Sequence, residues 1–217
     1  MNRYKYGKVH LLDSYIHKHI KIISLLVVVF SFLGFYCLTT LQLNQLLLFV
    51  PLSILTLLYG FSFITIKGVK YSLRYVPTLK IFLISLVWVL SIGLFPLIGK
   101  VEVDSTIVWF LIELFLFVIV LTLPFDIRDV TFDDKSLKTI PILFGVTKAK
   151  ILGVFMLFLA LFIHTSMQFM YLKASLITFG LLALLLMLSK PKKSNYYTAF
   201  WVEGIPIIWF LLVKFIA

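Results

Sequence analysis

Seven apolar segments separated by short polar stretches constrain this chain more than any other feature. They cover residues 20–39, 43–66, 80–98, 105–125, 149–171, 174–189 and 198–216. A helix needs roughly 20 residues to cross the hydrocarbon core of a bilayer. Backbone amides in lipid have no water to bond, so each span has to be helical. The pattern predicts an all-α membrane protein with seven transmembrane helices.

Composition agrees with a membrane bundle and argues against a soluble domain. Hydrophobic residues make up 62% of the chain, charged residues make up 13%, and the mean hydropathy is +1.10. The single cysteine, Cys37, lies in an apolar run and has no partner for an internal disulfide. No cleavable signal peptide is visible, because the first apolar run is long enough to span and no small-residue cleavage site follows it. We expect one polytopic membrane domain over residues 1–217, with residues 1–19 as a cytoplasmic juxtamembrane arm.

The positions of the basic residues predict the orientation. Of the 20 lysines and arginines, 17 lie in the N-terminal arm and in the loops after the second, fourth and sixth segments, or within two residues of them. Short cytoplasmic loops carry such an excess, so the N-terminus is predicted to be cytoplasmic and the C-terminus outside. The net charge of +11 is then explained by topology and by anionic lipid headgroups. No nucleic-acid-binding motif is present, and we expect no nucleic-acid partner.

An acidic stretch follows the fourth segment. Four of the nine carboxylates lie between Asp126 and Asp134. Asp126, Asp129 and Asp133 have the i, i+3, i+7 spacing that shares one face of a helix. Such carboxylates repel one another unless a cation lies among them, and Mg²⁺ commonly bridges carboxylates to substrate phosphates. The stretch predicts a cytoplasmic-face site for a phosphorylated ligand, with Arg128 and Lys138 available for phosphate oxygens.

The run from Asp126 to Gly145 resembles the second aspartate-rich motif of the UbiA superfamily of intramembrane prenyltransferases. The match includes the D-x-x-D-x-x-x-D spacing and the downstream Lys138-Thr-Ile-Pro141…Gly145. The resemblance implies a helical bundle, which has nine transmembrane helices in the family. It also implies transfer of a prenyl group from a prenyl pyrophosphate to a lipophilic aromatic or hydroxyl acceptor with Mg²⁺. Asp126, Asp129 and Asp133 would be the catalytic, metal-binding residues.

Two further stretches are similar to the family. Residues 59–68 resemble its tyrosine-to-lysine stretch, which implies that Lys67 contacts pyrophosphate. Arg74 and Lys80, in the same predicted loop, are further candidates, and the alternative is that all three are loop cations that set the topology. Glu203-Gly204 resembles an acid–glycine pair that would orient an acceptor. The alternative for Glu203 is an interfacial acid paired with a lysine.

One family feature is missing from this sequence. The N-D-x-x-D motif that ends the second helix of family enzymes is not found. If the acidic stretch follows the family's sixth helix, the resemblance implies that the seven segments correspond to family helices three to nine. Three explanations stay open: the chain is a fragment of a longer product, it binds prenyl lipids without catalysis, or other residues or oligomerisation restore the site. An ion transporter is a further class of function. Against it, the acids lie at a helix mouth and not at the bilayer midplane, where transporters place their sites.

Two ionisable residues lie inside predicted spans. An acid inside a span suggests a function, but Glu113 precedes Asp126 by 13 residues, which turns it away from the Asp126 face. We favour a structural role, in which it bonds a neighbouring helix or lies nearer the outer interface. His164 is likewise expected to form a helix-to-helix hydrogen bond. The acceptor, the prenyl length and the oligomeric state cannot be read from the sequence.

Overall fold

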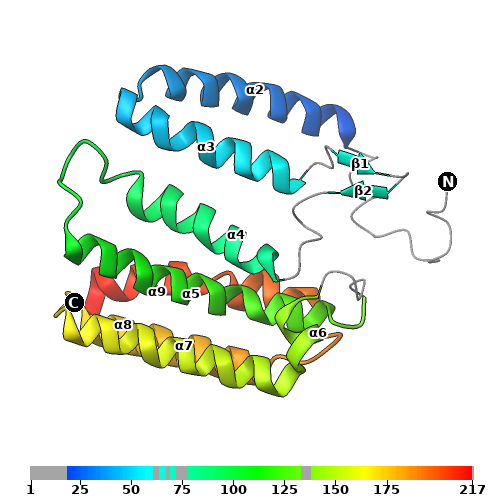
Figure 1. The fold of residues 1–217 in the computed structure, drawn as a ribbon, viewed down its shortest axis with the longest axis vertical. Helices are drawn as coiled ribbons and strands as arrows, with labels where there is room; N and C mark the ends of the chain where they lie inside the picture. The colour runs from blue at the N-terminus through cyan, green and yellow to red at the C-terminus, as the bar shows by residue number, and fades with distance from the viewer. Residues whose placement is uncertain (1–18, 61–63, 67–68, 72–77, 133–137, 217) are drawn as a thin grey trace. The chain divides into compact units, whose positions relative to one another are not determined.

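The computed structural model describes residues 19–60, 64–66, 69–71, 78–132 and 138–216. These residues are almost entirely helical (Figure 1). The helices are α2 (Ile20–Thr39), α3 (Leu43–Gly60), α4 (Leu79–Trp88), α5 (Ser105–Asp129), α6 (Ile140–Phe144), α7 (Val146–Ser166), α8 (Leu172–Leu188) and α9 (Ile205–Ile216). Two π-helical segments, η2 (Val89–Leu94) and η4 (Tyr197–Val202), follow α4 and precede α9.

Five of the described helical stretches are long and apolar enough to cross a membrane. They are α2, α3, α5, α7 and the stretch Tyr197–Ile216. The stretches Leu79–Leu94 and Leu172–Leu188 are apolar but shorter. Each of the seven expected segments therefore contains an apolar helix, and the structure is compatible with a membrane protein.

The predicted second segment, 43–66, is wrong at its C-terminal end. Helix α3 stops at Gly60, and Ile64–Ile66 forms strand β1, which pairs antiparallel with strand β2 (Val69–Tyr71). The residues of β1 are Ile-Thr-Ile, and β-branched residues favour extended backbone. A hydropathy pattern cannot distinguish such a run from the end of an apolar helix.

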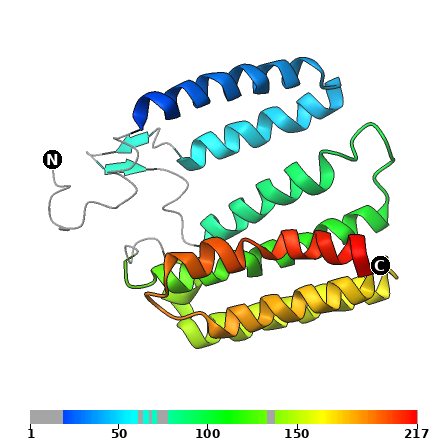
Figure 2. The same cartoon turned by 180° about the vertical axis from the view of Figure 1, so that it is seen from behind.

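The chain divides into two compact units, residues 1–46 and 47–217. In the second unit, α5 is the central helix and packs against α4, α6, α7 and α8 (Figures 1 and 2). Five consecutive residues, Phe117 to Leu121, are buried. A helix that is buried on every face has neighbours all around it, and this central place fixes the position of the charged residues at its C-terminal end.

Helix α7 has one face toward the core and one face away from it. Gly153, Leu157 and Ala160 are buried, and a Cβ on Gly153 would lie 2.8 Å from Leu123 of α5 and 2.5 Å from Leu186 of α8. Small residues at such positions let membrane helices approach closely. On another face of α7, Phe155, Phe158 and Phe162 are more than 60% exposed. An exposed aromatic stripe of this kind is unfavourable in water and suits a lipid-facing surface.

Candidate functional site

The C-terminal turn of α5 brings three charged residues to one end of the second unit. Asp126, Arg128 and Asp129 belong to the helix itself, which extends beyond the predicted end at residue 125. The backbone N–H of Phe132 then donates to the carbonyl of Asp129 at 2.8 Å, in a turn that follows the helix. Helix α5 therefore holds two of the three predicted aspartates, Asp126 and Asp129. Asp133 itself lies outside the described residues.

Asp126 is buried and forms an ion pair with Lys80. The Lys80 Nζ lies 2.7 Å from Asp126 Oδ1, and the two side chains are 21% and 5% exposed. Lys80 was expected in a loop, but it is the second residue of α4. The first turn of α4 thus places a cation against the last turn of α5. Removing a carboxylate from water is costly unless a charge and hydrogen bonds compensate, and Lys80 supplies that compensation.

Arg128 connects α5 to the π-helix η4. Its Nε and Nη2 donate to the two carboxylate oxygens of Asp129 at 2.6 and 2.7 Å. Its Nη1 donates to Thr198 Oγ1 at 2.5 Å. The guanidinium also lies over the ring of Phe125, 5.5 Å from the centroid. A planar fork of donors makes this two-oxygen contact, which a lysine cannot reproduce.

We call Lys80, Asp126, Arg128, Asp129 and Thr198 the α5 cluster. Thr198 was missed at the sequence level, because a threonine inside an apolar segment carries no signal of a distant partner. Thr198 lies in the π-helix η4, and π-helical turns occur frequently at functional sites. The cluster places two carboxylates, two cations and a hydroxyl at one end of the helix bundle.

The remaining predicted residues differ in how they relate to the α5 cluster. Lys138 is exposed, and its carbonyl accepts a hydrogen bond from the Thr78 N–H at 3.3 Å. Thr78 precedes Lys80 of the cluster by two residues. Glu203 is exposed at the junction of η4 and α9, and its N–H donates to the Thr198 carbonyl at 3.1 Å. Lys67 and Arg74 lie outside the described residues.

The cluster offers carboxylate oxygens, which are the ligand type that Mg²⁺ prefers. In the part of the chain that the structure describes, no three His, Cys, Asp or Glu side chains are grouped to hold a metal ion. Arg128 occupies both oxygens of Asp129. Each carboxylate oxygen keeps a further lone pair beside its cation contact, and through these lone pairs Asp126 and Asp129 would contribute to holding a Mg²⁺ ion.

Glu113 and His164 form the helix-to-helix contact that was expected of each. His164 Nδ1 and Glu113 Oε1 lie 2.9 Å apart and join α7 to α5. The pair lies away from the α5 cluster, since 13 residues of helix correspond to about 20 Å along the α5 axis.

No protein-family model, no curated protein and no solved structure matched this chain when it was compared with them. The site is therefore interpreted from its own residues.

Proposed function

We propose that this protein is a UbiA-like membrane protein of the prenyltransferase type, which binds the pyrophosphate group of a prenyl pyrophosphate at the α5 cluster. The observation that carries the proposal is the ion pair between Lys80 and the buried Asp126, with the Arg128–Asp129 pair one turn away. Buried and partly buried charges at the end of an apolar helix are costly and usually serve binding or catalysis. The first two aspartates of the stretch that resembles the family motif, Asp126 and Asp129, lie in this last turn of α5.

The residues of the cluster have separable roles in this proposal. Lys80 and Arg128 neutralise phosphate oxygens, and Arg128 contributes a planar fork that suits two oxygens at once. Thr198 orients the guanidinium. Lys67, Arg74 and Lys138 are further cations for the same anion, and Glu203 orients the acceptor. Asp126, Asp129 and Asp133 would hold Mg²⁺, which supplies neutralisation of charge on the leaving pyrophosphate.

The full arrangement that we propose has seven membrane helices. The five long apolar helices and the two shorter ones would all be embedded, and the shorter ones can span by local thinning of the bilayer and by snorkelling of flanking lysines. The N-terminus would be cytoplasmic and the C-terminus outside, which places the α5 cluster at the cytoplasmic face. Prenyl pyrophosphate and a lipophilic acceptor would then enter from the membrane and its inner surface.

A second candidate function is binding of prenyl lipids without catalysis. The cation partners of Asp126 and Asp129 favour it, because each carboxylate is already neutralised by a side chain of the same chain.

The proposal is tested by binding of a radiolabelled prenyl pyrophosphate to the full chain in lipid nanodiscs, with Mg²⁺ and with EDTA. We expect Asp129→Ala to abolish binding and Asp126→Asn to weaken it at least about tenfold, since a charge-assisted contact contributes roughly 1.5–3 kcal/mol. Glu102→Gln removes an exposed carboxylate before α5 and serves as the matched control, with binding unchanged. Equal binding by the wild type and Asp129→Ala would remove the site.

The same material separates the two candidate functions. Magnesium-dependent release of pyrophosphate in the presence of phenolic and hydroxylated acceptors supports the transferase. Tight binding without release supports the non-catalytic protein. Ion flux into liposomes without either result would support a transporter.

A further inference from the structure

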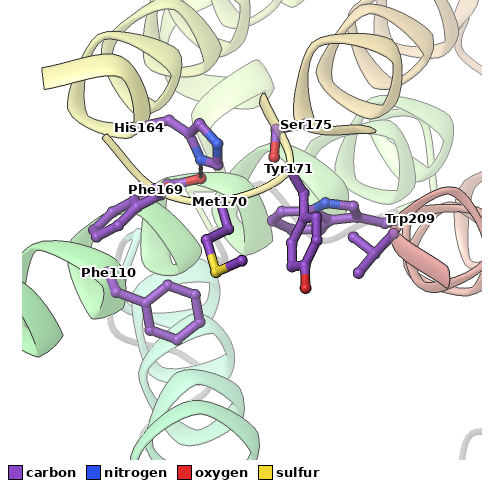
Figure 3. A pocket seen from close by; sticks show the side chains of 9 residues that line it. Phe110, His164, Phe169, Met170, Tyr171, Ser175 and Trp209 are labelled. Carbon is purple, nitrogen blue, oxygen red and sulfur yellow. Dashed lines mark hydrogen bonds and ion pairs between the residues drawn. The ribbon is translucent and has the colours of Figure 1, made fainter. Parts of the chain in front are cut away.

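A cavity of about 300 Å³ lies beside the N-terminal half of α5 (Figure 3). Its wall comes from α5, α7, the connection between α7 and α8, α8 and α9. The lining residues are Phe110, Glu113, His164, Phe169, Met170, Tyr171, Ser175, Trp209 and Val213. Glu113 and Asp126 are about 20 Å apart along the helix, so this cavity is separate from the α5 cluster.

Most of the wall is aromatic or apolar. Figure 3 shows Phe110 and Phe169 on one side of the cavity, Tyr171 and Trp209 on the other, and Met170 between them. Phe110 and Phe169 pack edge to face, with 6.1 Å between ring centroids. Trp209 packs against Phe117 and Phe179 of the core, which holds the indole in place. Such a wall suits a flat apolar group, because aromatic rings favour offset and edge-to-face contacts.

The Glu113–His164 pair is the polar feature of this wall. The side chains are 2% and 4% exposed, and they meet through Oε1 and Nδ1 at 2.9 Å. Their other polar atoms, Glu113 Oε2 and His164 Nε2, are buried without a hydrogen-bond partner among the described residues. A buried polar atom without a partner costs about 1–3 kcal/mol, so two such atoms in residues that line a cavity point to a missing partner.

The pair leaves one donor and one acceptor unpaired in every form without a net charge. With the proton on Glu113 Oε2 and the His164 Nδ1–H donating to Oε1, for example, Oε2–H donates and Nε2 accepts. With the proton on His164, the carboxylate Oε2 accepts and the imidazolium Nε2–H donates. With the shared proton on Glu113 Oε1, Oε2 is a carbonyl acceptor and the neutral imidazole keeps its Nε2–H. A net charge would be costly at this burial in a membrane helix. The unpaired atoms are therefore one acceptor and one donor, and a hydroxyl group satisfies both kinds.

We propose that this cavity is a binding site for a small apolar alcohol or phenol, whose hydroxyl bonds the Glu113–His164 pair and whose apolar body contacts Trp209, Phe110 and Phe169. The volume is at the lower end of the range for small-molecule pockets. It accommodates a compact ring or short chain and excludes a whole polyprenyl tail. The inference does not depend on the proposed function, because it uses neither the α5 cluster nor its ligand.

The test uses 4-propylphenol and its methyl analogue 4-propyltoluene with the full chain in lipid nanodiscs. The two probes have nearly the same shape and differ in the hydroxyl. Binding is followed by saturation-transfer NMR of the probe, and nanodiscs without protein give the partition into lipid. We expect the phenol to bind about tenfold more tightly than the methyl analogue, since losing a hydrogen bond to a buried polar group costs about 1.4 kcal/mol or more.

Two variants and one control make the result specific. Glu113→Leu combined with His164→Leu removes both unpaired polar atoms and is expected to reduce the preference for the phenol to less than about twofold. Val213→Phe fills the cavity from a partly buried position and is expected to weaken both probes at least about tenfold. Val108→Phe is the matched control, because Val108 is 45% exposed and does not line the cavity.

Equal affinity of the wild type for the two probes would overturn the proposal. An unchanged phenol preference in the folded Glu113→Leu and His164→Leu double variant, or unchanged binding in Val213→Phe, would overturn it as well. If the double variant does not fold, the comparison of the two probes on the wild type and the Val213→Phe result decide the question.

Discussion

Lys80 and Asp126, 46 residues apart in the chain, lie 2.7 Å apart and join the first turn of α4 to the last turn of α5. The carboxylate is the more buried partner, with a side-chain exposure of 5% against 21% for the lysine. The pair therefore has a structural role in addition to the binding role proposed for it. The two roles can be separated by measuring stability without any ligand.

The first prediction concerns the stability of this pair. Lys80→Met should lower the free energy of unfolding by about 2–3 kcal/mol, because it leaves a buried carboxylate without its charged partner. Lys80→Met combined with Asp126→Leu should recover much of the loss, because no buried charge is then left unpaired. Equilibrium unfolding in mixed micelles measures both. The coupling would be contradicted if the double variant loses as much free energy of unfolding as Lys80→Met and Asp126→Leu lose together when measured singly.

The second prediction concerns the close approach of α7 to α5 and α8. Gly153→Val should destabilise the second unit by about 1–3 kcal/mol, because the added carbons meet the buried Leu123 and Leu186 side chains. Gly180→Val is the matched control, since a Cβ at Gly180 has nothing within 4 Å. Thermal unfolding of both variants in the same detergent gives the comparison. Equal melting temperatures would show that the helices do not pack closely at Gly153.

The third prediction is a pH dependence at the start of α5. The Ile107 N–H donates to Asp104 Oδ1 at 2.9 Å and lowers the pKa of that carboxyl below its ordinary value. A carboxyl with a lowered pKa stabilises the folded state at neutral pH, and this contribution is lost as the pH falls below about 4. We expect amides in the first turn of α5 to exchange faster with solvent at pH 3 than at pH 6, after correction for the intrinsic exchange rate.

Asp104→Asn provides the control for this effect. Asparagine keeps the capping oxygen but does not titrate, so the protection of the first turn should lose its dependence on pH in this range. The same pH dependence in Asp104→Asn and the wild type would assign the effect to another group.

The fourth prediction tests the orientation in the membrane. In a Cys37→Ser background, a single cysteine at Met170 or at Lys192 should react with an impermeant maleimide from opposite sides of the bilayer. Both positions are exposed, and the basic loops predict Lys192 inside and Met170 outside. Labelling of intact cells should modify Met170→Cys, and labelling of inside-out vesicles should modify Lys192→Cys. The reverse pattern would invert the proposed topology.

The boundaries of the apolar segments were predictable to different degrees. The segment 20–39 coincides with α2. The segment 105–125 ends four residues early, since charged residues suggested an interface where the helix in fact continues to Asp129. The segment 43–66 ends six residues late, because the Ile-Thr-Ile run is as apolar as a helix end. Hydropathy measures how readily each residue enters an apolar environment. It does not distinguish a helix from a strand.

The candidate site was predictable in its location and not in its pairings. The charge pattern placed Asp126, Arg128 and Asp129 at one helix mouth. It left Lys80 as a loop cation and gave Thr198 no role, yet both contact the cluster. These contacts cross 46 and 70 residues of chain, and no local spacing rule covers such a separation.

The sequence alone determined that this chain is helical and suited to a membrane, because hydrophobic transfer is a sum over residues and needs no partner. It also determined that acids and bases gather at the end of one apolar helix. Only the tertiary structure decided which charges meet, that Gly153 admits a neighbouring helix, and that Glu113 and His164 face each other beside a cavity. Those outcomes depend on helix rotation and packing, which fix distances of a few ångströms between residues far apart in the chain.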